Sequence, residues 1–122
     1  MAKPLPPFIE SLVDLLSPLG ELRVKRMFGG FGFYLNEVFF AIADGNRFFL
    51  KTDEQTRPQF EAKGLAPFTY TTSDGSRSTM GYHEAPEEAL DSAIRMKAWA
   101  TLALQAAHRA QAAKKAPARK KR

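Results

Sequence analysis

His83 and Glu84 are the neighbouring residues of this chain that are best suited to acid–base chemistry. An imidazole that changes charge near neutral pH can exchange a proton with a substrate, and a carboxylate can assist it. Consecutive side chains in a strand point to opposite faces, however, so these two groups do not readily act together. We therefore expect His83 to be an exposed residue at the end of a strand.

Metal and cofactor chemistry has no support in the composition. The chain has two histidines and no cysteine, which excludes thiolate zinc sites, disulfides and cysteine nucleophiles. The second histidine, His108, lies in an Ala- and Arg-rich helical segment and is expected to be solvated. Asp53 fits a turn or helix-cap position. We expect no catalytic residue, no metal and no cofactor.

Three glycines, Gly29, Gly30 and Gly32, lie among large apolar residues. A phosphate-binding loop needs its glycines between a strand and the start of a helix, whereas this run leads into another strand. Glycine within a strand marks a bulge, a bend or a close approach of two backbones. The sequence therefore favours a structural role.

The positive charge is concentrated at the C-terminus. The formal net charge is +5, and without the six cations of the last nine residues, residues 1–113 have a net charge of −1. A disordered solubilising tail and a salt-sensitive nucleic-acid contact both fit this pattern. The candidate contacts are Lys114, Lys115, Arg119, Lys120, Lys121 and Arg122.

The apolar periodicity predicts an α+β domain over residues 1–111, followed by a disordered basic tail over 112–122. A five-stranded antiparallel sheet and helices form two layers in the order α-β(3)-α-β(2)-α. The helical segments are 8–16, 52–64 and 86 to about 113, the last with a second cap at Asp91 or Ser92. The strands are 30–35, 38–43, 47–51, 68–72 and 78–82, with a turn at Asn36-Glu37.

The strand Val38–Ala43 is apolar on both faces, which is typical of a central, doubly covered strand. Helices on one side of the sheet leave the other side open. Phe39, Phe49 and Trp99 are therefore the candidate partner surface, and a homodimer is the simplest way to cover it.

Several motifs, in this order along the chain, resemble the N-terminal domain of the TfoX/Sxy family of bacterial competence regulators. The first is the family signature, formed by Arg26, Met27, Phe28, Gly29, Gly30, Gly32 and Tyr34. The others lie at 38–41, 49–53, 67–70, 80–82, 86–90, 99–100 and 104–107.

The resemblance implies a fold like that of type III secretion chaperones. It also implies a non-enzymatic role, because the better-known members are co-activators that work with the cyclic-AMP receptor protein and carry a second domain. We therefore expect a cytoplasmic stand-alone N-terminal domain without a membrane span, which regulates transcription through a protein partner or itself. The alternative is an accessory protein that binds nucleic acid through the tail.

Overall fold

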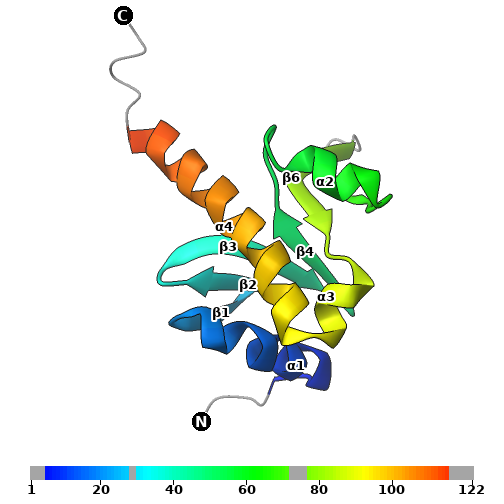
Figure 1. Ribbon diagram of the computed structural model, residues 1–122, viewed down its shortest axis with the longest axis vertical. Helices are drawn as coiled ribbons and strands as arrows, with labels where there is room; N and C mark the ends of the chain where they lie inside the picture. Colours follow the sequence, from blue (N-terminus) through cyan, green and yellow to red (C-terminus); the bar gives the residue numbers. More distant parts are fainter. Residues whose placement is uncertain (1–4, 28–29, 72–76, 116–122) are drawn as a thin grey trace, which may run out of the picture.

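The chain forms a curved antiparallel sheet with a long C-terminal helix across it (Figure 1). The structure, a computed structural model, describes residues 5–27, 30–71 and 77–115. Its helices are α1 (Pro7–Leu16), the 3-10 turn η1 (Ser17–Leu19), α2 (Arg57–Ala62), α3 (Glu87–Asp91) and α4 (Ala93–Lys115). Its strands are β1 (Leu22–Met27), β2 (Gly30–Leu35), β3 (Val38–Asp44), β4 (Arg47–Lys51), β5 (Pro67–Thr71) and β6 (Arg77–Glu84).

The strands pair in the order β1-β2-β3-β4-β6-β5, and every pair is antiparallel. The predicted α+β class is therefore confirmed, but the predicted count of five strands was wrong. The described residues include a sixth strand, β1, at the edge of the sheet. Leu22 and Val24 of β1 pack on the core, and Arg23 alternates with them. Edge strands commonly carry such charges, which prevent pairing with other chains.

The β2–β3 connection is a two-residue turn at Asn36 and Glu37, as predicted. Both residues have positive φ, 51° and 68°, as a type I′ turn requires. The side-chain Oδ1 of Asn36 also accepts a hydrogen bond of 3.0 Å from the backbone N–H of Glu21. This contact fixes the turn against the residue that precedes β1.

The main core lies between the sheet and the helices α1 and α4, which cover the same face. Each fully buried large apolar side chain stabilises the fold by about 1.5–3 kcal/mol. The large apolar side chains of this core that are completely buried are those of Leu12, Leu16, Phe33, Phe40, Leu50, Phe60 and Met96. The strand β3 is central in the sheet, as its apolar sequence predicted.

The last helical region is interrupted at Ser92, as predicted. Ser92 is extended (φ −149°, ψ 128°), and its Oγ accepts a hydrogen bond from the backbone N–H of Arg95. Helix α4 continues to Lys115, four residues into the segment predicted to be disordered. Residues 116–122 lie outside the described residues. In the part of the chain that the structure describes, no helix is long and apolar enough to cross a membrane.

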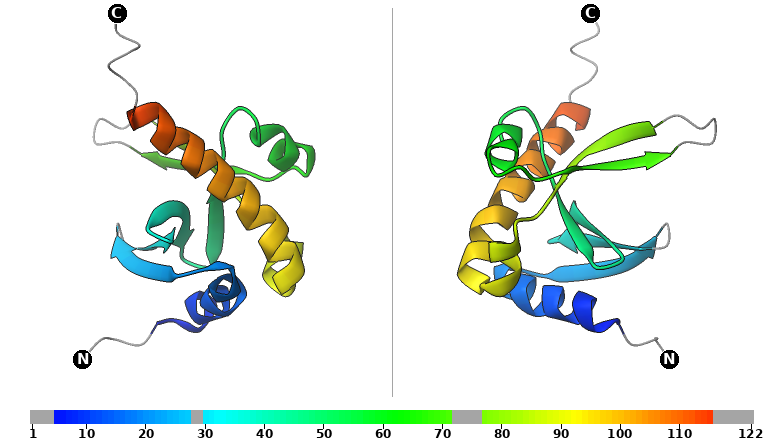
Figure 2. Two further views of the ribbon diagram at one scale, coloured as in Figure 1. Left: turned by 60° about the vertical axis from the view of Figure 1, so that its left-hand side comes forward. Right: turned by 90° about the vertical axis from the view of Figure 1, so that its right-hand side faces the viewer.

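A second, smaller cluster lies on the face of the sheet opposite α4. Ile42, Phe49 and Tyr82 are buried there, and Phe39 and Phe68 pack against them. On this side the β1–β2 and β5–β6 hairpins diverge from each other (Figure 2). The second face is therefore covered in part by the chain's own strand β5, which contributes Phe68.

Candidate functional site

His83 is buried in the main-core side of the sheet, so the prediction of an exposed strand-end histidine was wrong. Strand β6 lies inside the sheet, between β4 and β5, and Phe60 of α2 contacts the imidazole with 5.8 Å between ring centroids. His83 Nδ1 and Thr52 Oγ1 share a hydrogen bond of 2.9 Å. Burial lowers the pKa of His83 below its ordinary 6.5, and nearby Arg57 adds to this, while Glu61 opposes it. The histidine is therefore a neutral structural residue.

The neighbouring Glu84 is paired with a residue of β4. Its carboxylate accepts two hydrogen bonds from Arg47, of 3.0 and 3.3 Å. His108 is exposed, as expected. In the described ranges, no group of three His, Cys, Asp or Glu residues could hold a metal ion. His83 and Glu84 therefore have different hydrogen-bond partners, Thr52 and Arg47.

The family-signature residues that the structure describes lie on β1 and β2. The Arg26 guanidinium lies 4.9 Å from the centre of the Phe31 ring. Gly30 faces the backbone of β3 so closely that a Cβ there would overlap the carbonyl oxygen of Ala43. Gly32 pairs with Lys25 and Ile42. Phe28 and Gly29 lie outside the described residues, as does the side chain of Met27.

Tyr34, the last residue of the signature, lies on the second face of the sheet. The Arg23 guanidinium is 4.2 Å from the centre of its ring, and the Phe39 ring is 5.0 Å away. The described signature residues therefore build a hairpin and, through Tyr34, contribute to an aromatic surface.

Two of the three candidate partner-surface residues are buried in the chain itself. Phe49 is 2% exposed, under Phe68 at 4.8 Å between ring centroids. Trp99 is 9% exposed, packs edge-on against Phe60, and donates a 2.8 Å hydrogen bond from Nε1 to Glu88. Neither side chain forms an open surface. The sequence pattern showed their apolar character but not the strand and helix that cover them.

Phe39, the third candidate, is half-buried and lines a cleft of about 270 Å³ between the second face and the end of α4. Burial raises the pKa of Tyr82, which also lines the cleft, to about 12. The phenol therefore stays neutral at physiological pH. We name this hollow the Phe39 cleft; its lining residues are Phe39, Lys51, Tyr82, Ala107, Ala110 and Gln111.

A second hollow, of about 330 Å³, lies at the other end of α4. Ile94 borders it and is 83% exposed. Among the described residues, it is the large apolar side chain that is exposed to solvent. We name this hollow the Ile94 groove; its lining residues are Leu15, Pro18, Leu19, Ala93, Ile94 and Lys97. The sequence analysis did not predict this groove.

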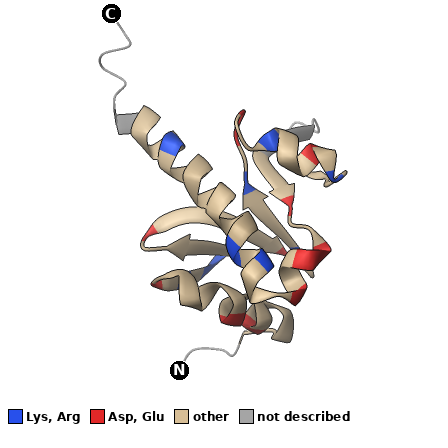
Figure 3. Cartoon of the chain, in the orientation of Figure 1, with Lys and Arg blue, Asp and Glu red and all other residues tan. Residues whose placement is uncertain are grey.

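Charge is distributed unevenly along the chain. No Asp or Glu follows Asp91, whereas nine Lys and Arg residues do. In Figure 3 the charged positions drawn on α4 are all basic, and the acidic ones lie on other elements.

Arg109 is neutralised by Asp53, with hydrogen bonds of 2.6 and 2.9 Å. Of the six predicted nucleic-acid contacts, Lys114 and Lys115 end α4, and the other four lie outside the described residues.

The profile of the TfoX N-terminal domain family matches residues 14–107 of this chain. The chain belongs to this family. A search of curated proteins found no match. The matched range of this TfoX N-terminal domain begins within α1 and ends within α4. It contains the signature residues, the Ile94 groove and four of the six residues that line the Phe39 cleft.

Proposed function

We propose that this TfoX N-terminal domain is a non-enzymatic regulatory module that acts through a protein partner in the transcriptional control of DNA uptake by a bacterium. Family membership supports the regulatory role, and the exposure of Ile94 supports a protein contact. A large apolar side chain in a groove on the surface is typical of an interaction site.

The chemistry of the Ile94 groove suits a short apolar segment of another protein. Leu15 and Leu19 line it together with Ile94, and Lys97 provides a cation at its border. We expect the partner segment to place an apolar side chain in the groove and a carboxylate next to Lys97. The groove is small, which fits a transient regulatory contact better than an obligate interface.

The test is Ile94→Asp, with Thr101→Asp as the matched control on the exposed surface of the same helix. Each variant replaces the wild-type protein in the bacterium that encodes it. Transcripts of DNA-uptake genes are then measured together with the transformation frequency. We expect Ile94→Asp to reduce both and Thr101→Asp to leave both unchanged. Equal effects, or none, would contradict a role for the groove. Sedimentation of the purified chain distinguishes self-association from a different partner.

A nucleic-acid-binding accessory role is the second candidate, and the absence of acidic residues after Asp91 favours it. A cationic segment without acids attracts phosphate groups regardless of sequence. This role uses the C-terminal end of α4 and the tail, whereas the Ile94 groove lies at the N-terminal end. The two candidates are therefore compatible in one molecule.

A further inference from the structure

Strand β1 is the more regular of the two edge strands of the sheet. It pairs with β2 over all six of its residues without a register shift, and it contains no proline. The opposite edge strand, β5, begins with Pro67 and has a register shift between Pro67 and Thr69. Prolines and irregularities of this kind protect an edge against pairing with further strands. Among the described residues, no strand lies on the outer side of β1, so its backbone edge is open (Figure 1).

Alternate residues of β1 direct their backbone groups to this open edge. The backbone N–H of Asn36 donates a hydrogen bond of 2.7 Å to the carbonyl oxygen of Glu21, just before the strand. In an antiparallel pair, every second residue bonds to the neighbouring strand in this way. The register therefore turns the N–H and C=O groups of Leu22, Val24 and Arg26 outward. Within the described ranges no hydrogen-bond partner takes up these outward groups, so they are available to an added strand.

The side chains of β1 differ between the two faces of the sheet. Leu22 and Val24 are half-buried and pack against the main core. Arg23 and Lys25 alternate with them and are exposed. An added strand would continue both faces, because the side chains of paired strands alternate in step. It would therefore contact apolar side chains on one face and cations on the other.

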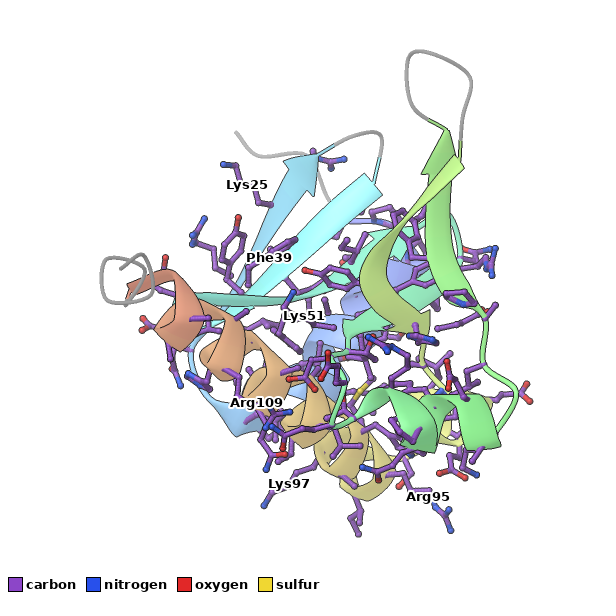
Figure 4. All side chains as sticks on the ribbon, turned by 90° about the horizontal axis from the view of Figure 1, so that it is seen from above. Lys25, Phe39, Lys51, Arg95, Lys97 and Arg109 are labelled. Carbon is purple, nitrogen blue, oxygen red and sulfur yellow. The ribbon has the colours of Figure 1, made fainter. Side chains whose placement is uncertain are left out.

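Positive charge is unbalanced in the second half of β1. Arg23, in the first half, is paired with Glu37 at 2.8 Å. Lys25 and Arg26 are exposed, and neither forms an ion pair with another described residue. Figure 4 shows the Lys25 side chain at the outer border of β1, on the side away from β2. A carboxylate on an added strand would compensate this charge.

The same cations disfavour pairing with a second copy of this chain. A symmetric antiparallel pair that joins all three outward residues is centred on Val24 and places Arg23 opposite Lys25 of the second copy. Like charges directly opposite each other destabilise a strand pair. The charges on this edge therefore act against one kind of partner and select a strand of the opposite sign.

We propose that β1 binds an extended acidic strand of a partner protein by strand addition. Acidic side chains of that strand lie next to Lys25 and Arg26, and apolar ones lie next to Leu22 and Val24. In this binding mode, backbone hydrogen bonds provide affinity and the side chains provide specificity. The edge shares no residue with the Ile94 groove, so the inference goes beyond the function proposed above and does not depend on that groove.

The experiment titrates the isotope-labelled full-length protein with a short peptide that alternates valine and glutamate, and follows binding by NMR. Hydrogen exchange of the amides of Leu22, Val24 and Arg26 should become slower, because the added strand takes up their N–H groups. Two further peptides carry N-methyl groups, one on every valine and the other on every glutamate. Strand pairing uses the amides of alternate residues, so one of these peptides should lose binding and the other should retain it.

Two matched comparisons separate the charge from the backbone pairing. Lys25→Glu should weaken peptide binding by about fivefold or more, whereas Arg95→Glu, a charge reversal at an exposed residue of α4, should not weaken it. Arg26→Gln and Arg26→Pro remove the same charge, but only proline also removes the outward N–H. Proline is tolerated where the N–H of an edge strand faces solvent. We therefore expect Arg26→Pro to bind the peptide more weakly than Arg26→Gln does.

Three outcomes would overturn the strand addition. They are absence of peptide binding, an equal effect of the two N-methyl patterns, and equal binding by Lys25→Glu and Arg95→Glu. None of them affects the function proposed for the Ile94 groove, which is tested by Ile94→Asp in the bacterium. Loss of peptide binding in Ile94→Asp alone would assign the acidic peptide to that groove instead. Slow exchange at β1 that appears without peptide as the protein concentration rises would assign the edge to a second copy.

Discussion

Gly30 shows how one residue of the signature determines the packing of the hairpin. Its place in the sequence suggested a bend, a bulge or a close approach, and the structure shows the close approach. Its backbone faces the Ala43 carbonyl oxygen of β3 without room for a Cβ. Steric overlap with backbone cannot be relieved by a rotamer change, so strands β2 and β3 would have to separate locally.

We expect Gly30→Ala to lower the free energy of unfolding by about 2 kcal/mol or more, measured by urea denaturation. Gly64→Ala is the control. Gly64 has φ +71°, but nothing lies within 4 Å of a Cβ there, so only backbone strain of about 1–2 kcal/mol is expected. A smaller loss for Gly30→Ala than for Gly64→Ala would contradict the steric explanation.

The buried His83 makes stability depend on pH. Its pKa lies below 6.5 in the folded chain, chiefly because of burial, so the unfolded chain takes up the proton first. Stability should therefore fall as the pH drops below about 6.5. Between neutral pH and about pH 5, the melting temperature should decline less in His83→Gln than in the wild type. His108→Gln, at an exposed site, should decline like the wild type.

Burial of His83 could not be predicted from neighbouring residues. Its strand is flanked by β4 and β5, and that order brings residues far apart in sequence together, as in the pairing of Leu50 with His83. Phe60, which contacts the ring, comes from yet another segment. Local alternation showed that His83 and Glu84 face opposite sides but not which side was covered.

At the scale of elements, one ion pair connects α4 to the segment between β4 and α2. The Asp53 carboxylate accepts hydrogen bonds from Arg109 and from the backbone N–H groups of Gln55 and Thr56. Arg109 contributes most to lowering the pKa of Asp53 to about 2. Asp53 therefore serves as the predicted turn or cap residue and also anchors the helix that forms one wall of the Phe39 cleft.

We expect Asp53→Asn and Arg109→Ala to lower the melting temperature more than Arg95→Ala, whose ion pair with Glu88 is longer, at 3.3 Å, and more exposed. The Asp53 contribution is present above about pH 3.8 and is lost as the pH falls towards 2. The difference in melting temperature between the wild type and Asp53→Asn should therefore become smaller as the pH falls through that range. A constant difference would assign the effect to packing.

Local rules predicted most elements, because their causes are local. The break at Ser92 and the turn at Asn36-Glu37 follow from capping and turn chemistry within a few residues. Strand β1 was missed because Arg23, Lys25 and Arg26 make it resemble a loop. Its strand character comes from pairing with β2, which is a property of the sheet.

At the scale of the whole molecule, α4 separates two different surfaces. The Ile94 groove lies at its first turn and the Phe39 cleft at its last turns. Ile94 and Gln111 are seventeen residues apart in the sequence, which corresponds to about 26 Å along the helix. The two ends of α4 therefore carry separate surfaces, so a ligand at one end does not cover the other.

The tail should contribute to binding and not to folding. We expect a variant with Arg119, Lys120, Lys121 and Arg122 changed to Gln to have a free energy of unfolding within about 0.5 kcal/mol of the wild-type value. The reason is that these four residues follow the last described helix. Each phosphate contact with a single strand contributes about 0.7 to the slope of log K against log salt concentration. If all four cations contact phosphates, the slope for oligo(dT) should fall by about 3. An unchanged slope would mean that cations outside the tail hold the strand.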